Sequence, residues 1–155
     1  MKVLLVEPNY KNKYPPIGLM KISTYHKMLG DEVHFVKGID PKIDAEVWDR
    51  IYVTTLFTFD FDISIETIKH YMHLVDNVNN LYVGGIMATL MPDSIVKATG
   101  IDRSQILTGL FTDTSIVGYD NNVNVDKLPL DYDLLEEIEY KYSIPTAFQD
   151  FIKQF

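Results

Sequence analysis

The stretch LYVGGIMATLMPD, residues 81–93, begins as a short apolar run and continues into two adjacent glycines. Glycine at a strand end costs backbone entropy, so it is expected where the chain needs a positive φ or where another group approaches the backbone closely. Small residues follow Gly84 and Gly85 and lead to Pro92, which is suited to begin a helix. The stretch therefore predicts a buried strand that passes through a turn into a helix.

Strand and helix patterns alternate in the same way along the rest of the chain. Short apolar or β-branched runs predict strands at residues 3–6, 33–36, 50–57, 81–83 and 105–108. Apolar residues at helical spacing predict helices that begin near Pro16 and near Asp60 or Asp62. This alternation is typical of a parallel sheet with right-handed crossovers. We therefore predict a single Rossmann-like (flavodoxin-like) α/β domain with a doubly wound sheet of about five parallel strands.

The pattern weakens from about residue 118 onward. We expect residues 1–118 to form the α/β domain and residues 119–155 to form a linker and tail that packs on it. The run DLLEEIEY, residues 133–140, predicts one helical turn. The run SIPTAFQDFIKQF, residues 143–155, predicts a short amphipathic helix, because Phe148, Phe151, Ile152 and Phe155 fall on one side. Such an apolar face should be covered by the domain or by a partner.

Composition excludes several classes of protein. A net charge of −8 argues against binding to nucleic acid or to an anionic membrane surface. No apolar run approaches the roughly 20 residues of a membrane-spanning helix. The absence of cysteine excludes disulfides, thiolate metal sites and iron–sulfur clusters in this chain. The apolar run in MKVLLVEPNY is too short for a signal peptide, so we expect a cytoplasmic location.

The carboxyl edge of the predicted sheet is the expected ligand site, because ligands bind there in open parallel sheets. Three segments meet at this edge: EPNYKN (7–12), TTLFTF (54–59) and GGIMAT (84–89). Neither a G-x-G-x-x-G nor a G-x-x-x-x-G-K-[ST] motif occurs, which removes the commonest nucleotide sites. Ser115 has no histidine–acid partner, so no catalytic residue is predicted. His26, His34, His70 and His73 have no partner at a ligand spacing, so no metal site is predicted.

These three segments resemble the cobalamin-binding domain, and especially the amino-terminal domain of B12-dependent radical SAM proteins. Members of that group carry D-x-H-x-x-G after the first strand, S-x-L after the third and Gly-Gly after the fourth. Here residues 7–12, Thr54-Thr55-Leu56 and Gly84-Gly85 stand in these places, with 27 residues between Leu56 and Gly84. YPPIGLM, GGIMATLMP and LPLDYDLL are also similar to that group, so the resemblance extends over roughly residues 1–140.

The resemblance implies a corrinoid-binding, or degenerate corrinoid-binding, domain that takes cobalamin in its base-off form. The residues that it implies at the cofactor are Asn9, Tyr10, Thr54, Thr55, Leu56, Gly84 and Gly85. A bulky residue at Gly85 would then block the cofactor. Asn9 stands where the cobalt-ligating histidine would be, and an amide is a poor ligand for cobalt. The C-x-x-x-C-x-x-C loop is absent, so the chain alone is not catalytic; it would be part of a B12-dependent radical SAM enzyme and have the radical SAM barrel or another protein as its partner.

Two other functions fit the same fold. A protein-interaction or regulatory module without a cofactor would dock through the aromatic tail, and Asn9 and the missing cysteines favour this alternative. A receiver-like phosphorelay domain is disfavoured, because no acidic pair follows the first strand and no lysine ends the last one.

Overall fold

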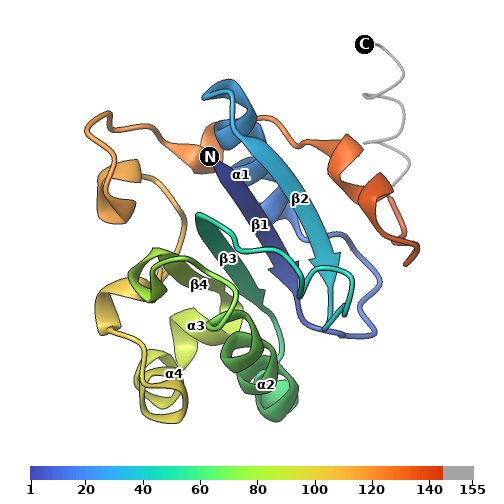
Figure 1. Cartoon of the computed structure of the whole chain (residues 1–155), viewed down its shortest axis with the longest axis vertical. Coiled ribbons are helices and arrows are strands. Elements are labelled where there is room, and N and C mark those ends of the chain that lie inside the picture. Colours follow the sequence, from blue (N-terminus) through green and yellow to red (C-terminus); the bar gives the residue numbers. More distant parts are fainter. Residues whose placement is uncertain (145–155) are drawn as a thin grey trace.

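Four parallel strands form one sheet in the computed structural model of the chain, which describes residues 1–144 (Figure 1). Their order across the sheet is β2-β1-β3-β4, and every neighbouring pair is parallel. The strands are β1 (Lys2–Glu7), β2 (Glu32–Lys37), β3 (Arg50–Thr55) and β4 (Leu81–Gly85). The Rossmann-like parallel α/β fold predicted from the sequence is confirmed. The order reverses between β1 and β3, which places the switch point of the topology beside the end of β3.

The prediction of a fifth strand at residues 105–108 is wrong. Ile106 makes only an isolated parallel bridge to Val83, and the Leu107 amide donates to the Val83 carbonyl at 2.7 Å. A 3-10 turn at Arg103–Gln105 precedes this bridge. The Gln105 side chain donates to the backbone carbonyls of Val78 and Leu81, at 2.7 and 2.8 Å. A side chain thus takes backbone acceptors beside β4, and the bridge does not extend into a fifth strand.

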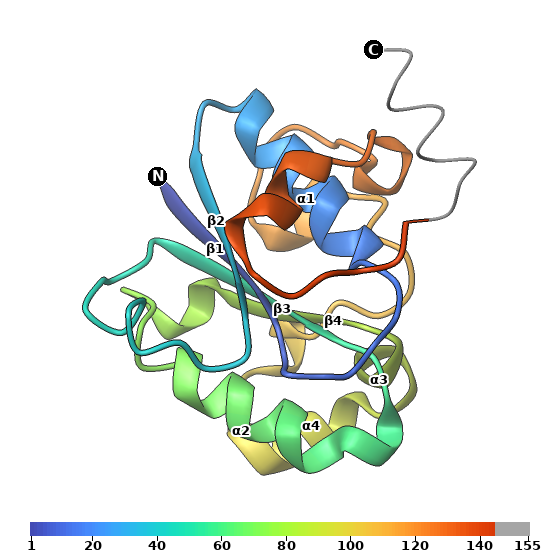
Figure 2. The same cartoon turned by 90° about the vertical axis from the view of Figure 1, so that its right-hand side faces the viewer.

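Helices cover the two faces of the sheet in unequal numbers (Figure 2). Helix α1 (Ile17–Met28) lies on one face, together with the carboxyl-terminal segments. Helices α2 (Phe61–Tyr71), α3 (Ile86–Leu90) and α4 (Pro92–Thr99) pack on the other face. Right-handed crossovers on opposite sides of the switch point produce this arrangement. We call the two sides of the sheet the α1 face and the α2 face.

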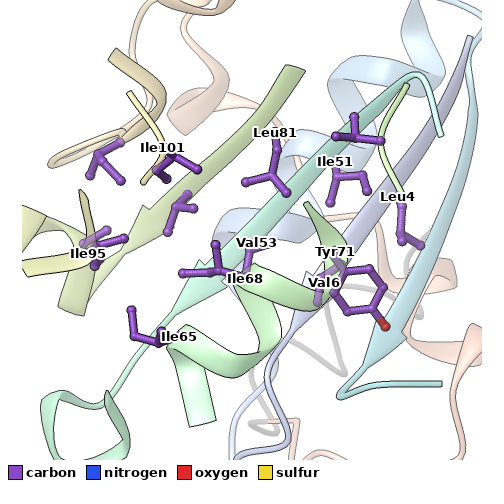
Figure 3. Close-up of a cluster of buried hydrophobic side chains, with 14 of the residues drawn as sticks. Leu4, Val6, Ile51, Val53, Ile65, Ile68, Tyr71, Leu81, Ile95 and Ile101 are labelled. Carbon is purple, nitrogen blue, oxygen red and sulfur yellow. The ribbon is translucent and has the colours of Figure 1, made fainter. Parts of the chain in front are cut away.

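Each face of the sheet has its own hydrophobic core. Successive strand residues point to opposite faces, so Val3 and Leu5 join the α1-face cluster, and Leu4 and Val6 the other. Figure 3 shows the α2-face cluster, in which side chains from the strands meet Ile65, Ile68 and Tyr71 of α2. Burial on both faces explains why the strands are continuously apolar.

Residues 119–144 pack on the α1 face. Val125 and Leu134 are each 1% exposed within the α1-face cluster. The Asp131 amide donates to the Met20 carbonyl at 3.2 Å, and the Ser23 hydroxyl donates to the Asp131 carboxylate at 2.6 Å. The predicted turn in DLLEEIEY corresponds to a 3-10 helix at Tyr132–Glu137. The amphipathic helix predicted around Phe148, Phe151, Ile152 and Phe155 lies outside the described residues. No helix within residues 1–144 has the length and apolar character needed to cross a membrane.

Candidate functional site

A cleft of about 850 Å³ opens at the carboxyl ends of β3 and β4, on the α1 face. Its walls come from the loop before α1, the first turns of α1, the start of α3 and residues 107–111. Most lining side chains are apolar, among them Leu19, Ile22, Tyr82, Leu107 and Phe111. Cofactor sites in proteins have this size and character, with a few polar groups that orient the ligand. The cleft lies at the edge where ligands bind in open α/β sheets.

The two glycines at the end of β4 have different structural causes. Gly85 has a φ of +98°, and a Cβ added there would lie 2.0 Å from the Thr55 carbonyl oxygen. The β3 backbone therefore leaves no room for a side chain at Gly85, and tryptophan there would disrupt the sheet rather than block a ligand. A Cβ added at Gly84 would meet only Leu107 atoms, the nearest at 3.6 Å, which is an ordinary contact. Gly84 lines the cleft, so its missing side chain leaves space there.

The two threonines at the end of β3 also differ. Thr55 is 1% exposed, and its hydroxyl donates to the Gly84 carbonyl at 2.7 Å and accepts from the Ala88 amide at 3.0 Å. This hydroxyl is therefore committed to bonds within the chain. Thr54 pairs with Gly84 in the sheet register and is half-buried at the cleft. No hydrogen bond joins its hydroxyl to any other residue of the described part of the chain, so it is free to bind a ligand.

The remaining predicted site residues lie around the exits of β1 and β3. Leu56 lines the cleft, and its amide donates to the Tyr10 hydroxyl at 3.3 Å. Tyr10 is 2% exposed and also bonds the Ser64 hydroxyl at 2.5 Å, and burial raises the pKa of its phenol. Asn9 is exposed and lies against Gly38, outside the cleft. Tyr10 therefore holds the exit of β3 in place, and neither it nor Asn9 borders the cleft.

Comparisons with known proteins support the fold and leave the family open. No family model matches the sequence, and no curated protein matches it. Among solved structures, the chain is similar to the radical S-adenosylmethionine methyltransferase TsrM from Kitasatospora setae, with cobalamin and a [4Fe-4S] cluster bound. The TM-score is 0.52 at 22% identity, over 65% of this chain and 21% of the TsrM chain. The chain thus corresponds to about a fifth of that protein, and at this identity the likeness shows a shared fold.

The sequence pattern placed Asn12 at this edge, but it did not predict that Lys13 and the first turns of α1 line the cleft. The loop before α1 contributes Asn12, Lys13 and Tyr14, and α1 contributes Ile17 and Lys21. Lys21 pairs with Asp126 at 3.0 Å, which joins α1 to the carboxyl-terminal segment across the cleft. The YPPIG sequence at the start of α1 was the available signal, because it places a rigid, apolar turn at the carboxyl edge.

A buried ion pair next to the cleft was also missed. Lys37 and Glu7, at the ends of β2 and β1, pair at 2.6 Å with side chains 3% and 2% exposed. Burial lowers the pKa of the Lys37 ammonium, although Glu7 opposes this shift. A charged residue at the end of each of two neighbouring strands was the signal in the sequence.

The expectation that His26 and His34 lack partners is wrong. His26 is fully buried, with Nδ1 at 2.8 Å from Asp31 and Nε2 at 2.9 Å from the Tyr52 hydroxyl. His34 Nδ1 lies 3.3 Å from the Glu137 carboxylate. The three partners, Asp31, Tyr52 and Glu137, lie outside the element of the histidine that they contact, so a search for metal-ligand spacing did not reveal them. Within residues 1–144, no group of three or more His, Asp or Glu side chains could hold a metal ion.

Proposed function

We propose that this chain binds a corrinoid, cobalamin in its base-off form, with the nucleotide tail in the cleft at the carboxyl edge of the sheet. The observation that carries the proposal is the cleft that Gly84 borders, where a Cβ at Gly84 would make only ordinary contacts with Leu107 and no neighbouring atom requires a glycine. Support also comes from the motif resemblance and from the fold shared with a protein solved with cobalamin bound. The residues present fit the tail, because the cleft combines an apolar lining with a few polar groups.

Different side chains of the cleft would make different contacts with the nucleotide tail. Gly84 leaves room against the sheet, and the Thr54 hydroxyl supplies a hydrogen bond to a polar atom of the tail. Apolar side chains such as Tyr82 and Leu107 exclude water from the buried part. Lys13 lines the cleft and brings a positive charge suited to the phosphate of the tail. The Thr55 hydroxyl and the Gly85 backbone would support this site from within the sheet.

The cobalt ion would have no protein ligand in this proposal. Asn9, which replaces the expected histidine, lies exposed beside Gly38 and outside the cleft. When bound, a corrinoid supplies a cobalt ion that can carry an alkyl group. The chain contains no cysteine, so an iron–sulfur cluster held by thiolates would have to come from another domain or protein. The chain would therefore act as a binding module and not as a complete enzyme.

The test is retention of hydroxocobalamin after desalting, read from the visible spectrum of the protein fraction. We expect the wild-type chain to retain the corrinoid and Gly84→Ala to retain nearly as much, since a methyl group there makes only ordinary contacts. Gly84→Phe should weaken binding at least about tenfold, because its ring fills the cleft. Far-ultraviolet circular dichroism should match among the three proteins.

A colourless wild-type fraction would overturn the proposal, and equal retention by Gly84→Phe would move the binding site away from this cleft. The second candidate is a protein-interaction module. It is favoured by exposed apolar side chains at the cleft: Leu90 and Leu110 line it and are 67% and 69% exposed, and Phe59, 81% exposed, stacks on the lining residue Phe57. Clustered apolar side chains of this kind mark interaction surfaces.

A further inference from the structure

Residues 140–143, which we call the strap, cross the carboxyl ends of β1 and β2. The Tyr140 hydroxyl donates to the Asn12 carbonyl at 2.5 Å, and the Ser143 amide donates to the Lys13 carbonyl at 2.7 Å. The Tyr142 hydroxyl donates to the Glu7 carboxylate. The strap is therefore bonded both to the end of β1 and to the loop that precedes α1.

The strap also covers the buried ion pair. The Lys37 ammonium lies 4.3 Å from the centre of the Tyr140 ring and 5.4 Å from that of the Tyr142 ring. It donates to Glu7 and also to the Asn12 side-chain oxygen, at 2.7 Å. Asn12 in turn donates to the other Glu7 oxygen at 3.0 Å. The rings exclude water from this cluster and stabilise the cation through their π faces.

The loop held by the strap is a wall of the cleft. Asn12, Lys13 and Tyr14 line the cleft, and the Asn12 side chain donates to the Tyr14 carbonyl at 3.0 Å. Two of these residues accept hydrogen bonds from the strap through their carbonyls. The strap bonds and the bonds of the Asn12 side chain to Glu7 and Lys37 together hold the wall in place.

We infer that Tyr140 and Tyr142 are positioning residues for the cleft: Tyr140 holds the Asn12–Tyr14 wall directly through the Asn12 carbonyl, and Tyr142 holds it through Glu7 of the Glu7–Lys37 pair. The expected change in corrinoid affinity rests on the proposed function, whereas the expected change in amide exchange rests only on the contacts described above. Neither tyrosine lines the cleft, so neither touches the ligand itself.

Tyr-to-Phe variants isolate the hydroxyl groups. Phenylalanine keeps the ring over Lys37 and removes only the bond to Asn12 or to Glu7. Tyr132→Phe is the matched control, because Tyr132 lies in the same carboxyl-terminal segment and its hydroxyl makes no hydrogen bond to residues 1–144. The Tyr140→Phe, Tyr142→Phe and double variants are compared with this control and with the wild-type chain.

Two measurements test the inference, namely amide hydrogen exchange along the chain and titration with hydroxocobalamin. We expect the double variant to exchange about tenfold faster at the Ser143 amide, which donates to the Lys13 carbonyl, and at residues 11–14, with unchanged exchange in the strand β1 core. Its corrinoid affinity should fall several-fold, and each single variant should show part of both effects. Tyr132→Phe should leave both unchanged.

Unchanged exchange at Ser143 and at residues 11–14 in the double variant would overturn the inference. Faster exchange over the whole sheet would also overturn it, because the tyrosines would then act on global stability. Faster local exchange with unchanged corrinoid affinity would show that the two tyrosines hold the wall but do not affect corrinoid binding, which would overturn their role as positioning residues for the cleft. If the wild-type chain retains no corrinoid, the proposed function fails, and the exchange measurement alone decides whether the strap fixes the wall.

Discussion

Burial and two hydrogen bonds decide the charge state of His26. The Arg50 guanidinium donates to the Tyr52 oxygen at 3.4 Å, and the Tyr52 hydroxyl can donate to His26 Nε2 at 2.9 Å. His26 Nδ1 then donates to the Asp31 carboxylate. This directional chain needs the neutral imidazole, because a proton on Nε2 would leave the Tyr52 hydroxyl without its acceptor. The network links the buried Arg50 cation to a carboxylate through two neutral groups.

The stability of the protein should therefore fall between about pH 6.5 and mildly acidic pH. Burial, and to a lesser extent Arg50, lowers the pKa of His26 below its ordinary value of 6.5, although Asp31 opposes this shift. Below pH 6.5 the unfolded chain binds a proton that the folded chain does not, so the unfolding free energy decreases as pH falls, by at most about 1.4 kcal/mol per pH unit. Burial would raise the pKa of Asp31, but hydrogen bonds from His26 and the terminal amine lower it, so its contribution is lost only at lower pH, near and below its ordinary value of 3.8.

Urea denaturation from pH 5 to 7.5, with nuclear magnetic resonance titration of the imidazole protons, measures this effect. A His26 midpoint at or above 6.5 would contradict the prediction.

Residue identity alone could not separate the roles of Gly84 and Gly85. The sequence shows two equivalent glycines, and the motif resemblance treats them as a pair. The atom that forbids a side chain at Gly85 is the carbonyl of Thr55, which lies in another strand. The distinction between Thr54 and Thr55 arises in the same way, from Ala88 and Gly84. The sequence therefore predicted the place of the cleft and the residues near it, and the sheet register decides which of them can contact a ligand.

Helix α3 depends on a side chain from another element. Its first residue follows Gly85, which has no side chain to cap the helix. The Thr55 hydroxyl accepts from the amide of Ala88, the third residue of α3, and so replaces the missing cap. The same hydroxyl joins β3 to β4 through the Gly84 carbonyl. One oxygen atom thus fixes the junction between two strands and a helix at the base of the cleft.

Thr55→Val should destabilise the fold by about 1–3 kcal/mol, because a buried amide and a buried carbonyl lose their partner while the volume stays similar. Thr55→Ser keeps the hydroxyl and should recover most of this loss. Urea denaturation of the three proteins measures the difference. Equal midpoints for Thr55→Val and the wild-type chain would show that the hydroxyl does not stabilise the junction.

The elements that the sequence predicted well are those that pack on both sides. Strands β1 and β3 at the centre of the sheet are buried on two faces, so their apolar runs are nearly continuous and easily recognised. The run at residues 105–108 has similar composition, but Gln105 bonds the neighbouring carbonyls with its side chain. The helical turns after residue 118 are short 3-10 segments without an amphipathic period, so the sequence predicted that this segment packs on the domain but not that it packs on the α1 face.

At the scale of the whole molecule, residues 119–144 complete the core of the α1 face. Leu134 is 1% exposed, and partly buried residues surround this part of the cluster, namely Val123, Leu128, Leu130, Tyr132 and Leu135. Two ion pairs, Lys21 with Asp126 and Lys27 with Asp131, and a contact of the His34 ring with Glu137 join the segment to the first 34 residues. We therefore expect this segment to unfold together with the sheet.

Leu134→Ala should lower the unfolding free energy by about 2–5 kcal/mol, the usual loss for a leucine deleted from a packed core. Val47→Ala is the control, because Val47 is 64% exposed and its loss should change stability by less than about 0.5 kcal/mol. Urea denaturation, followed by circular dichroism and by the fluorescence of the buried Trp48, measures the unfolding free energy of both variants. A loss below 1 kcal/mol for Leu134→Ala, or two separate transitions in the wild-type chain, would contradict this prediction.

The bonds from Tyr140 to Asn12 and from Tyr142 to Glu7 span 128 and 135 residues of sequence. Contacts between such distant residues form late, because a long loop must close before they contribute any free energy. During translation, β1 and the loop after it leave the ribosome long before the tyrosines that hold them are made. A nascent chain would therefore form its sheet before the pocket is complete, and it would become able to bind a ligand only in the last steps of its maturation.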